Sequence, residues 1–138
     1  MNLKYMDIAI KESYKAIKDG DIPVGAVIVK NDIVISKSYN QKTKKGIATN
    51  HAEIIAINKA CAKIGDWRLN NCEMYVTLEP CCMCKGAVEE ARIERVYYLL
   101  PSSYYKNKTN YDNYEMVKNG KYVSYRKYVD NFFKSIRK

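Results

Sequence analysis

Residues 74–87 read Met-Tyr-Val-Thr-Leu-Glu-Pro-Cys-Cys-Met-Cys-Lys-Gly-Ala, and they give the strongest local indication of the fold class. Met74–Leu78 is an apolar run of strand length that Pro80 ends, and Cys82–Ala91 has the small residues of a closely packed helix. A second strand, Arg95–Leu100, follows. Alternation of strand and helix predicts an α/β sheet that helices cover on both faces.

The sequence on either side supplies the remaining elements. Spacings of three and four between apolar residues predict a helix over residues 3–18, which Gly20 would cap. Val24–Val29 and Ile33–Ser38 are short apolar runs around a polar turn, and they predict a β-hairpin. The other expected elements are helices over His51–Ile64 and Tyr125–Ile136, and loops over Gln41–Thr49 and 102–113.

The composition indicates one globular domain. The chain has 138 residues, of which 47% are hydrophobic and 28% charged, as is typical of globular rather than disordered proteins. No apolar run approaches the roughly 18–20 residues of a membrane helix, and the first residues lack the apolar core of a secretory signal. We therefore expect a single domain over residues 1–138, no membrane association and a cytoplasmic location.

The positive charge is concentrated near the C-terminus. Residues 101–138 carry a net charge of +6 out of a total of +9, together with seven of the 13 tyrosines. A basic, tyrosine-rich segment indicates a polyanionic partner such as RNA. A general compositional bias, with 19 lysines against five arginines, explains the same charge. The charge alone therefore leaves both interpretations open.

Three of the cysteines are clustered, and the total of five is odd, which favours metal binding or catalysis over disulfides. Cys81 and Cys84 lie three residues apart at a predicted helix start, where both sulfurs can reach one ion and main-chain N–H groups favour thiolates. His51, at the start of another predicted helix, offers an imidazole. Two thiolates and one imidazole suit a zinc ion with one open position, which is the catalytic arrangement.

Glu53 follows His51 by two residues and is expected beside the metal rather than among its ligands. A carboxylate there can accept a proton from water and pass it on. The other cysteines have plainer interpretations: Cys82 as a small helix residue, and Cys61 and Cys72 as buried apolar residues. A fourth protein ligand would instead indicate a non-catalytic zinc module that binds RNA, and a redox pair would leave the histidine and glutamate unexplained.

The combined pattern, His-x-Glu followed by Pro-Cys-x-x-Cys, is the signature of zinc nucleobase deaminases. The chain resembles the cytidine deaminase-like superfamily, and within it the bacterial tRNA-specific adenosine deaminases. The supporting segments are Asp21–Val29, Asn40, His51–Ile54, Asp66–Leu69, Met74–Ala87 and, more weakly, Phe132-Phe133 with Arg137. The resemblance implies a three-layer α-β-α sandwich with a mixed five-stranded sheet. It also implies one Zn²⁺ per subunit on His51, Cys81 and Cys84, with Glu53 as the catalytic proton shuttle.

The resemblance further implies hydrolytic deamination of adenosine to inosine at the wobble position of a tRNA anticodon loop, by a homodimer. The implied substrate contacts are Asn40, the main chain of Ala52 and Cys81, an apolar wall of Ile22, Pro23 and Val24, and phosphate contacts from Lys42, Lys44, Lys45 and the C-terminal lysines. The C-terminal tyrosines would stack on bases. Each contact has a plain alternative, namely strand packing, a turn, a solvated surface or the core.

Two segments depart from the family pattern. Gly46–Asn50 stands where the family has an Asp-Pro-Thr-Ala run, and Tyr98–Tyr105 replaces a pattern of Gly, Asp and Lys-Thr-Gly after the fourth strand. Both segments lie near the substrate entrance in the family. A second substrate class therefore stays open: a free base or nucleoside of the guanine, cytosine or cytidine type.

Overall fold

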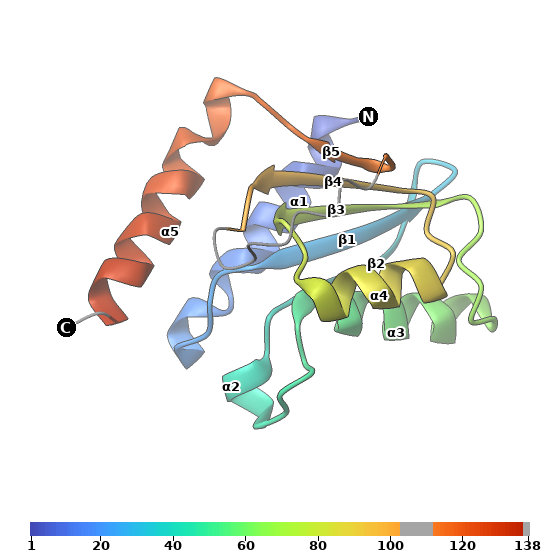
Figure 1. Ribbon diagram of the computed structural model, residues 1–138, viewed down its shortest axis with the longest axis horizontal. Coiled ribbons are helices and arrows are strands. Elements are labelled where there is room, and N and C mark those ends of the chain that lie inside the picture. Colours follow the sequence, from blue (N-terminus) through green and yellow to red (C-terminus); the bar gives the residue numbers. More distant parts are fainter. Residues whose placement is uncertain (103–111, 137–138) are drawn as a thin grey trace.

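The computed structural model describes residues 1–102 and 112–136 of the chain. Its centre is a mixed five-stranded sheet of order β2-β1-β3-β4-β5, with helices on both faces (Figure 1). β1 runs antiparallel to β2 and β3, whereas β3, β4 and β5 are parallel to one another. The predicted α/β class and the mixed five-stranded sheet implied by the resemblance are confirmed.

The described part of the chain contains five strands, five helices and two 3₁₀ turns. In chain order they are α1 (Leu3–Tyr14), a 3₁₀ turn (Ile17–Asp19), β1 (Gly25–Lys30), β2 (Ile33–Tyr39), α2 (Lys42–Lys45), α3 (Ala52–Ile64), β3 (Cys72–Leu78), α4 (Cys82–Glu90), β4 (Arg95–Leu100), β5 (Tyr114–Met116), a 3₁₀ turn (Gly120–Tyr122) and α5 (Val123–Ile136). Among the described helices, none combines the length and apolar character needed to cross a bilayer.

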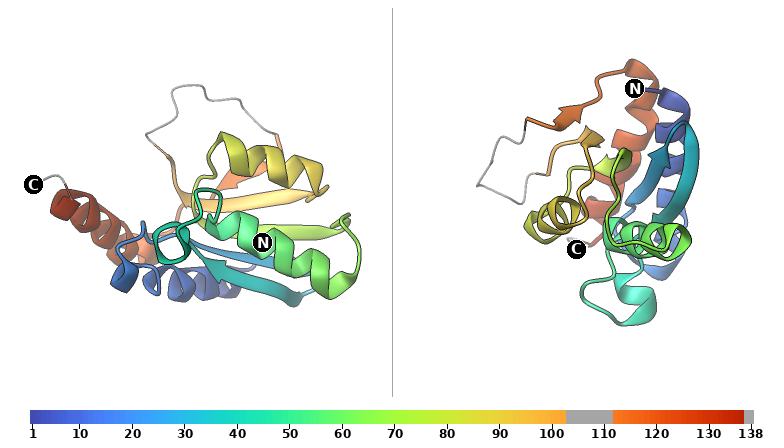
Figure 2. Two further views of the ribbon diagram at one scale, coloured as in Figure 1. Left: turned by 90° about the horizontal axis from the view of Figure 1, so that it is seen from below. Right: turned by 90° about the vertical axis from the view of Figure 1, so that its right-hand side faces the viewer.

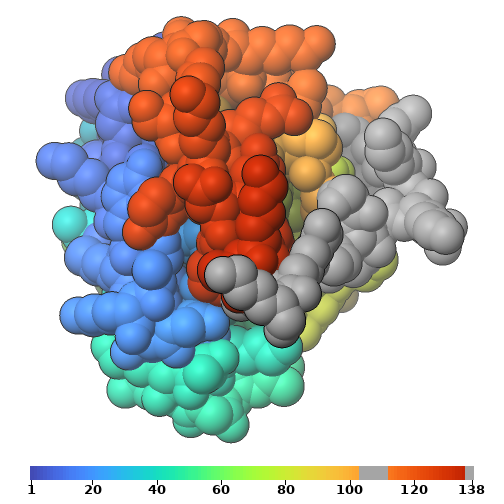
Figure 3. Space-filling view, turned by 90° about the vertical axis from the view of Figure 1, so that its left-hand side faces the viewer, coloured from blue at the N-terminus to red at the C-terminus, as the bar shows by residue number. Residues whose placement is uncertain are grey.

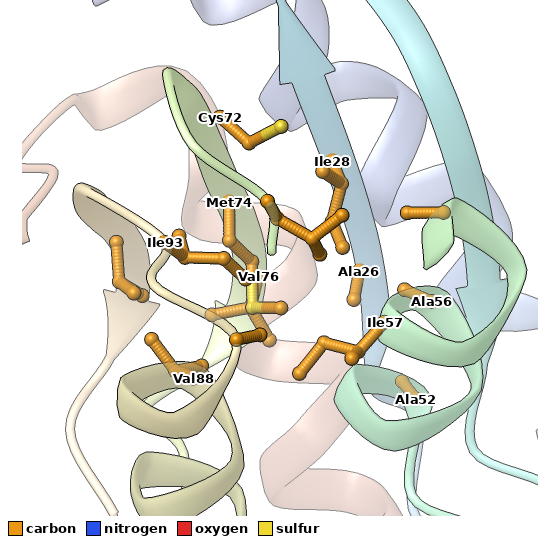
Figure 4. Packing of buried hydrophobic residues seen from close by; sticks show 14 of the residues in the cluster. Ala26, Ile28, Ala52, Ala56, Ile57, Cys72, Met74, Val76, Val88 and Ile93 are labelled. Atoms are coloured by element: carbon orange, nitrogen blue, oxygen red, sulfur yellow. The ribbon is translucent and has the colours of Figure 1, made fainter. Parts of the chain in front are cut away.

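Alternating side chains of the strands build two cores. On one face, Met74 and Val76 of β3 pack with Ala56 and Ile57 of α3 and with residues of α4 (Figure 4). On the other face, Tyr75 packs with α1 and with the buried side of α5. Figure 2 shows α3 and α4 on one side of the sheet and α1 on the other, so the three-layer arrangement follows from the period of two in the strands.

Local signals account for several element ends. Asn31 and Asp32, between β1 and β2, have φ angles of 51° and 59°, and two successive positive values are typical of the tight turn that a hairpin favours. Gly20 has a φ of 77° and ends the segment that begins with α1, as predicted. The helix expected over residues 3–18 is divided, however, because α-helical structure ends at Tyr14.

Two elements were not predicted from the residues. The expected loop Gln41–Thr49 contains α2, because the buried Asp21 carboxylate accepts hydrogen bonds from the main-chain N–H groups of Thr43 (2.7 Å) and Lys44 (3.2 Å). β5 has only three residues and forms by pairing with β4, so the local sequence carries little signal for it. The expected loop at 102–113 lies mostly outside the described residues.

The C-terminal helix α5 is held against the body of the protein by its apolar stripe. Tyr125 and Val129 are buried in the core beside α1, and Phe133 packs against the same cluster. The Tyr125 hydroxyl donates to the carbonyl oxygen of Pro23 at 2.7 Å and lies 2.8 Å from the Thr77 hydroxyl. Figure 3 shows α5, in red, beside the N-terminal segment in blue and above the α2 region in teal.

Candidate active site

Two helices begin at one place in the fold. His51 is the residue before α3, and Cys81 is the residue before α4, which follows the end of β3. Both helices lie on the same face of the sheet and run in the same direction (Figure 1), and their N-terminal ends bring His51 and Cys81 close together. Positive helix ends of this kind favour thiolates and other anionic groups. His51 and Cys81 are 30 residues apart in the sequence, and the arrangement of strands and helices brings their side chains together.

Three ligating atoms meet between these helix ends. His51 Nδ1 lies 3.7 Å from Cys81 Sγ and 3.6 Å from Cys84 Sγ, and the ligating atoms of the three residues all lie within 4.8 Å of one another. A tetrahedral zinc ion with bonds of about 2.0 Å to nitrogen and about 2.3 Å to sulfur needs a nitrogen–sulfur separation of about 3.5 Å. The donor set and its spacing therefore fit Zn²⁺.

Hydrogen bonding among these side chains shifts their pKa values. The contact with Cys84 lowers the pKa of Cys81, while the same contact and burial raise the pKa of Cys84. The hydrogen bond to Cys81 raises the pKa of His51. The cluster thus favours a thiolate on Cys81 and a protonated thiol on Cys84. A bound cation would displace the Cys84 proton and so favour a second thiolate.

The remaining cysteines stay apart from this cluster. Cys82 is exposed, Cys72 is buried in the core and Cys61 is half-buried near the Trp67 carbonyl. Within the described ranges 1–102 and 112–136, the group of possible metal ligands contains His51, Cys81 and Cys84 and no fourth member. Three protein ligands leave a zinc ion one position for water or substrate, as in catalytic sites.

Glu53 is a buried carboxylate next to this cluster. Its side chain is in the first turn of α3, is 4% exposed and borders the cavity in front of the metal ligands. Burial raises the pKa of its carboxyl group to about 7. A carboxyl group that contacts the Cys84 thiol and faces a cavity is in position to accept a proton and return it.

A cavity of about 510 Å³ opens in front of the metal ligands. Six of the residues predicted to contact substrate line it: Ile22, Val24, Asn40, Lys42, Ala52 and Cys81. The structure does not bring Pro23 to the cavity, because Pro23 is fully buried and its carbonyl accepts the Tyr125 hydrogen bond. The volume is within the range of pockets that bind small molecules.

Asn40 is held in one orientation by the main chain. Its side-chain oxygen accepts a hydrogen bond from the N–H of Lys42 at 3.2 Å, and its amide nitrogen donates to the carbonyl of Ile22 at 3.3 Å. Because a primary amide has two N–H groups and two lone pairs, one donor and one acceptor site stay available to a ligand. Asn40 is therefore both a turn residue and a candidate substrate contact.

The cavity also contains residues that sequence reasoning did not place there. Leu78 is the last residue of β3 and Glu79 comes directly after it, while Ser102 lies two residues beyond the end of β4. Their positions at strand ends were the available signal, since ligands of open α/β sheets bind outside the carboxyl ends of the strands. Phe133, which was noted only as part of the weaker resemblance near the C-terminus, also lines the cavity.

The C-terminal tyrosines divide between core and surface. Tyr122 and Tyr125 are buried and Tyr128 is half-exposed, so the packing interpretation is right for the first two. Tyr104, Tyr105, Lys106, Lys108, Tyr111 and Arg137 lie outside the described residues.

Comparison with known proteins adds family and substrate information. Residues 1–100 match the family described as the cytidine and deoxycytidylate deaminase zinc-binding region. Curated relatives include tRNA-specific adenosine deaminases of Bacillus subtilis (45% identity over 94 residues) and Rickettsia bellii (48% over 92 residues). These alignments cover 68% and 65% of this chain, and 58% and 63% of the relatives. The chain thus spans about three-fifths of the length of the curated relatives it matches.

Two solved structures are similar in different ways. One, from studies of A-to-I editing by tRNA:A34 deaminases at the wobble position of transfer RNA, has a TM-score of 0.73 and 39% identity, with 75% of each chain covered. The other, guanine deaminase from Bacillus subtilis, has a TM-score of 0.69 and 27% identity, with 95% of each chain covered. The first is more similar in sequence, and the second covers more of the chain.

Proposed function

Because this chain belongs to the family of cytidine and deoxycytidylate deaminase zinc-binding regions, we propose that it hydrolyses adenosine to inosine at the wobble position of a tRNA anticodon loop. One observation carries the chemistry: His51, Cys81 and Cys84 converge beside a buried glutamate at an open cavity. The names and sequence similarity of the curated relatives support the substrate.

Each side chain has a separate task in this reaction. His51, Cys81 and Cys84 would hold one Zn²⁺ ion, which lowers the pKa of bound water to about 7. Glu53 accepts one proton from water and delivers it to the ring nitrogen. It then takes the second proton, from the hydroxyl group added to the ring carbon, and passes it to the departing amine, so that adenosine and water give inosine and ammonia. Ile22 and Val24 exclude water from the base, and Asn40 offers its free amide groups to the nucleoside.

The substrate is tested with purified, zinc-loaded protein and three probes: an anticodon stem-loop with adenosine at the wobble position, free guanine, and cytidine. Inosine at the wobble position, detected by nucleoside mass spectrometry, supports the proposal. Turnover of guanine or cytidine with an unchanged stem-loop would overturn it. A Cys81→Ser protein is the control for contaminating activity.

Guanine deamination is the second candidate because of one specific observation. The guanine deaminase structure covers 95% of this chain, whereas the tRNA deaminase structure covers 75%. The likeness to a free-base deaminase therefore includes sequence beyond the zinc-binding region, which ends at residue 100. The stem-loop and guanine probes separate the two functions directly.

The lysines of α2 would contact RNA phosphates. Lys42 lines the cavity, and the exposed Lys45 follows it in the same short helix. A Lys45→Ala variant should weaken stem-loop binding and reduce the slope of log Kd against log salt concentration by about one, because one phosphate contact is lost. Lys63→Ala, on the exposed side of α3, is the matched control and should leave that slope unchanged.

We also propose that the protein is a cytoplasmic homodimer. Apolar side chains are exposed near the cavity-side ends of two helices, with Met83 of α4 at 37% and Ile47, before α3, at 48%. A second copy of the chain would cover such residues. Light scattering coupled to size exclusion should give twice the chain mass, and a monomer at micromolar concentration would contradict the proposal.

A further inference from the structure

Lys85 is a buried lysine next to the metal ligands, and the proposed reaction does not use it. It follows Cys84 in α4, its side chain is 8% exposed, and its ammonium nitrogen lies 5.7 Å from the centre of the Tyr114 ring in β5. Burial of an ammonium group is costly unless a partner compensates for lost water. Glu79 is such a partner, and its Oε2 atom lies 3.1 Å from Lys85 Nζ.

Glu79 joins three parts of the fold. Its main-chain N–H donates to the carbonyl of Leu100 at 2.8 Å, at the end of β4. Its Oε1 atom accepts a hydrogen bond from the Ser102 N–H at 3.2 Å, and its Oε2 atom faces Lys85. Each carboxylate oxygen thus binds a different segment, so movement of the carboxylate would release both contacts.

These contacts lie in the wall of the cavity. Glu79 and Ser102 both line the cavity, and Ser102 is buried although it follows the last strand residue by two positions. Lys85 also offsets the negative charge of Glu79, in a site that already contains Glu53 and the two cysteines. An uncompensated carboxylate at this wall would repel a polyanion such as RNA.

We propose that Lys85 and Glu79 are positioning residues: their ion pair fixes Ser102 against the beginning of α4 and so sets the shape and charge of this wall of the substrate cavity. The inference rests on the proposed function only for the choice of substrate. The position of Ser102 can be measured without any substrate, so failure of this inference and failure of the proposed function are distinguishable.

The test uses Lys85→Met, which keeps the length of the side chain and removes its charge. In the zinc-loaded protein, exchange of the Ser102 amide, followed by NMR, should be at least about tenfold faster, because the carboxylate is no longer held. With the stem-loop probe, KM should rise about tenfold while kcat changes less than about threefold, because a wall is displaced and the metal ligands are not. Zinc content should stay at one per chain.

A double variant, Glu79→Gln with Lys85→Met, provides the rescue. The glutamine oxygen can still accept from the Ser102 N–H and carries no charge, so both exchange and KM should return to within about threefold of the starting protein. Lys63→Met, an exposed lysine of α3, controls for loss of one positive charge and should change neither value.

Unchanged exchange at Ser102 in Lys85→Met would overturn the inference, as would a double variant that behaves like the single one. If Lys85→Met does not fold, the double variant decides, since a folded protein with slow Ser102 exchange supports the role and fast exchange contradicts it. If the stem-loop is not a substrate, guanine replaces it in the KM measurement and the exchange result stands.

Discussion

Glu53 is a carboxyl group that the fold buries although packing alone does not require one there. It is 4% exposed, and the described salt bridges do not include it. A buried carboxyl group without a cationic side chain is costly for stability. Its place beside the metal ligands and at the cavity supports the proposed transfer of protons between water and substrate.

Glu53→Gln should therefore abolish most turnover without disturbing the metal. The amide keeps the size of the side chain but cannot accept the proton, so kcat should fall by about 10²- to 10⁴-fold while zinc content stays at one per chain. Stopped assays on the stem-loop and metal analysis measure both quantities. Glu90→Gln, an exposed glutamate at the end of α4, is the matched control. Full activity in Glu53→Gln would show that another group moves the proton.

The neighbouring cysteines Cys81 and Cys82 should differ sharply in zinc binding. Cys81 Sγ lies 3.7 Å from His51 Nδ1, whereas the Cys82 side chain is exposed to solvent. Cys81→Ser should lose most bound zinc, because a serine hydroxyl is a much poorer ligand than a thiolate. Cys82→Ser should keep one zinc per chain, as measured by atomic emission. Zinc loss in Cys82→Ser would contradict the ligand assignment.

At the scale of elements, the α1 backbone lies directly against β1 at Gly25. A Cβ atom on Gly25 would lie 1.9 Å from the Ala9 carbonyl oxygen, so no side chain fits without movement of α1. Gly25→Ala should lower the free energy of unfolding by about 1–3 kcal/mol or more. Urea denaturation measures the change.

Gly86 is the control for this substitution. It lies inside α4, and a Cβ there would meet nothing within 4 Å. Gly86→Ala should raise the free energy of unfolding by about 0.5–1 kcal/mol, because alanine favours the helix. Equal effects of the two substitutions would contradict the close α1–β1 contact.

The anchoring of α5 depends on one hydroxyl group. Because the carbonyl of Pro23 can only accept, the Tyr125 proton must point to it, and Thr77 then donates to Tyr125 while accepting from the Gly25 N–H at 3.2 Å. Tyr125→Phe should lower the free energy of unfolding by about 1–3 kcal/mol, because a buried carbonyl loses its partner. Tyr128→Phe, at a half-exposed site, should change it by less than about 0.5 kcal/mol. Urea titrations that gave equal losses would exclude this network as the anchor.

Elements with long apolar runs or helical spacing were predictable, whereas those that depend on distant partners were not. α2 is stabilised by Asp21, about 20 residues earlier in the chain, and β5 by pairing with β4. The same distinction holds at the site. His51, Glu53 and the cysteines have local spacings that indicate zinc chemistry, but Glu79 and Ser102 meet only because Leu78 pairs with Leu100 between β3 and β4.

At the scale of the whole molecule, the zinc-binding region and the folded unit have different limits. The family match ends at residue 100, but β5 extends the sheet beyond it. Val117, Tyr122, Tyr125 and Val129 are buried against α1 and the sheet, and Phe133 lines the cavity. The described part of the C-terminal quarter therefore completes both the second core and the cavity.

A chain that ends after residue 100 should therefore not fold independently. Removal of the segment after residue 100 would expose Tyr5, Tyr75 and Tyr97, which pack together beside that segment. It would also leave β4 as an open edge of the sheet. We expect no cooperative thermal transition by circular dichroism, and aggregates on size exclusion. A chain that ends after Ile136 is the control and should unfold like the full chain, because it keeps β5 and α5. A cooperative transition in the shorter chain, at the temperature of the full one, would mean that the zinc-binding region is a domain by itself.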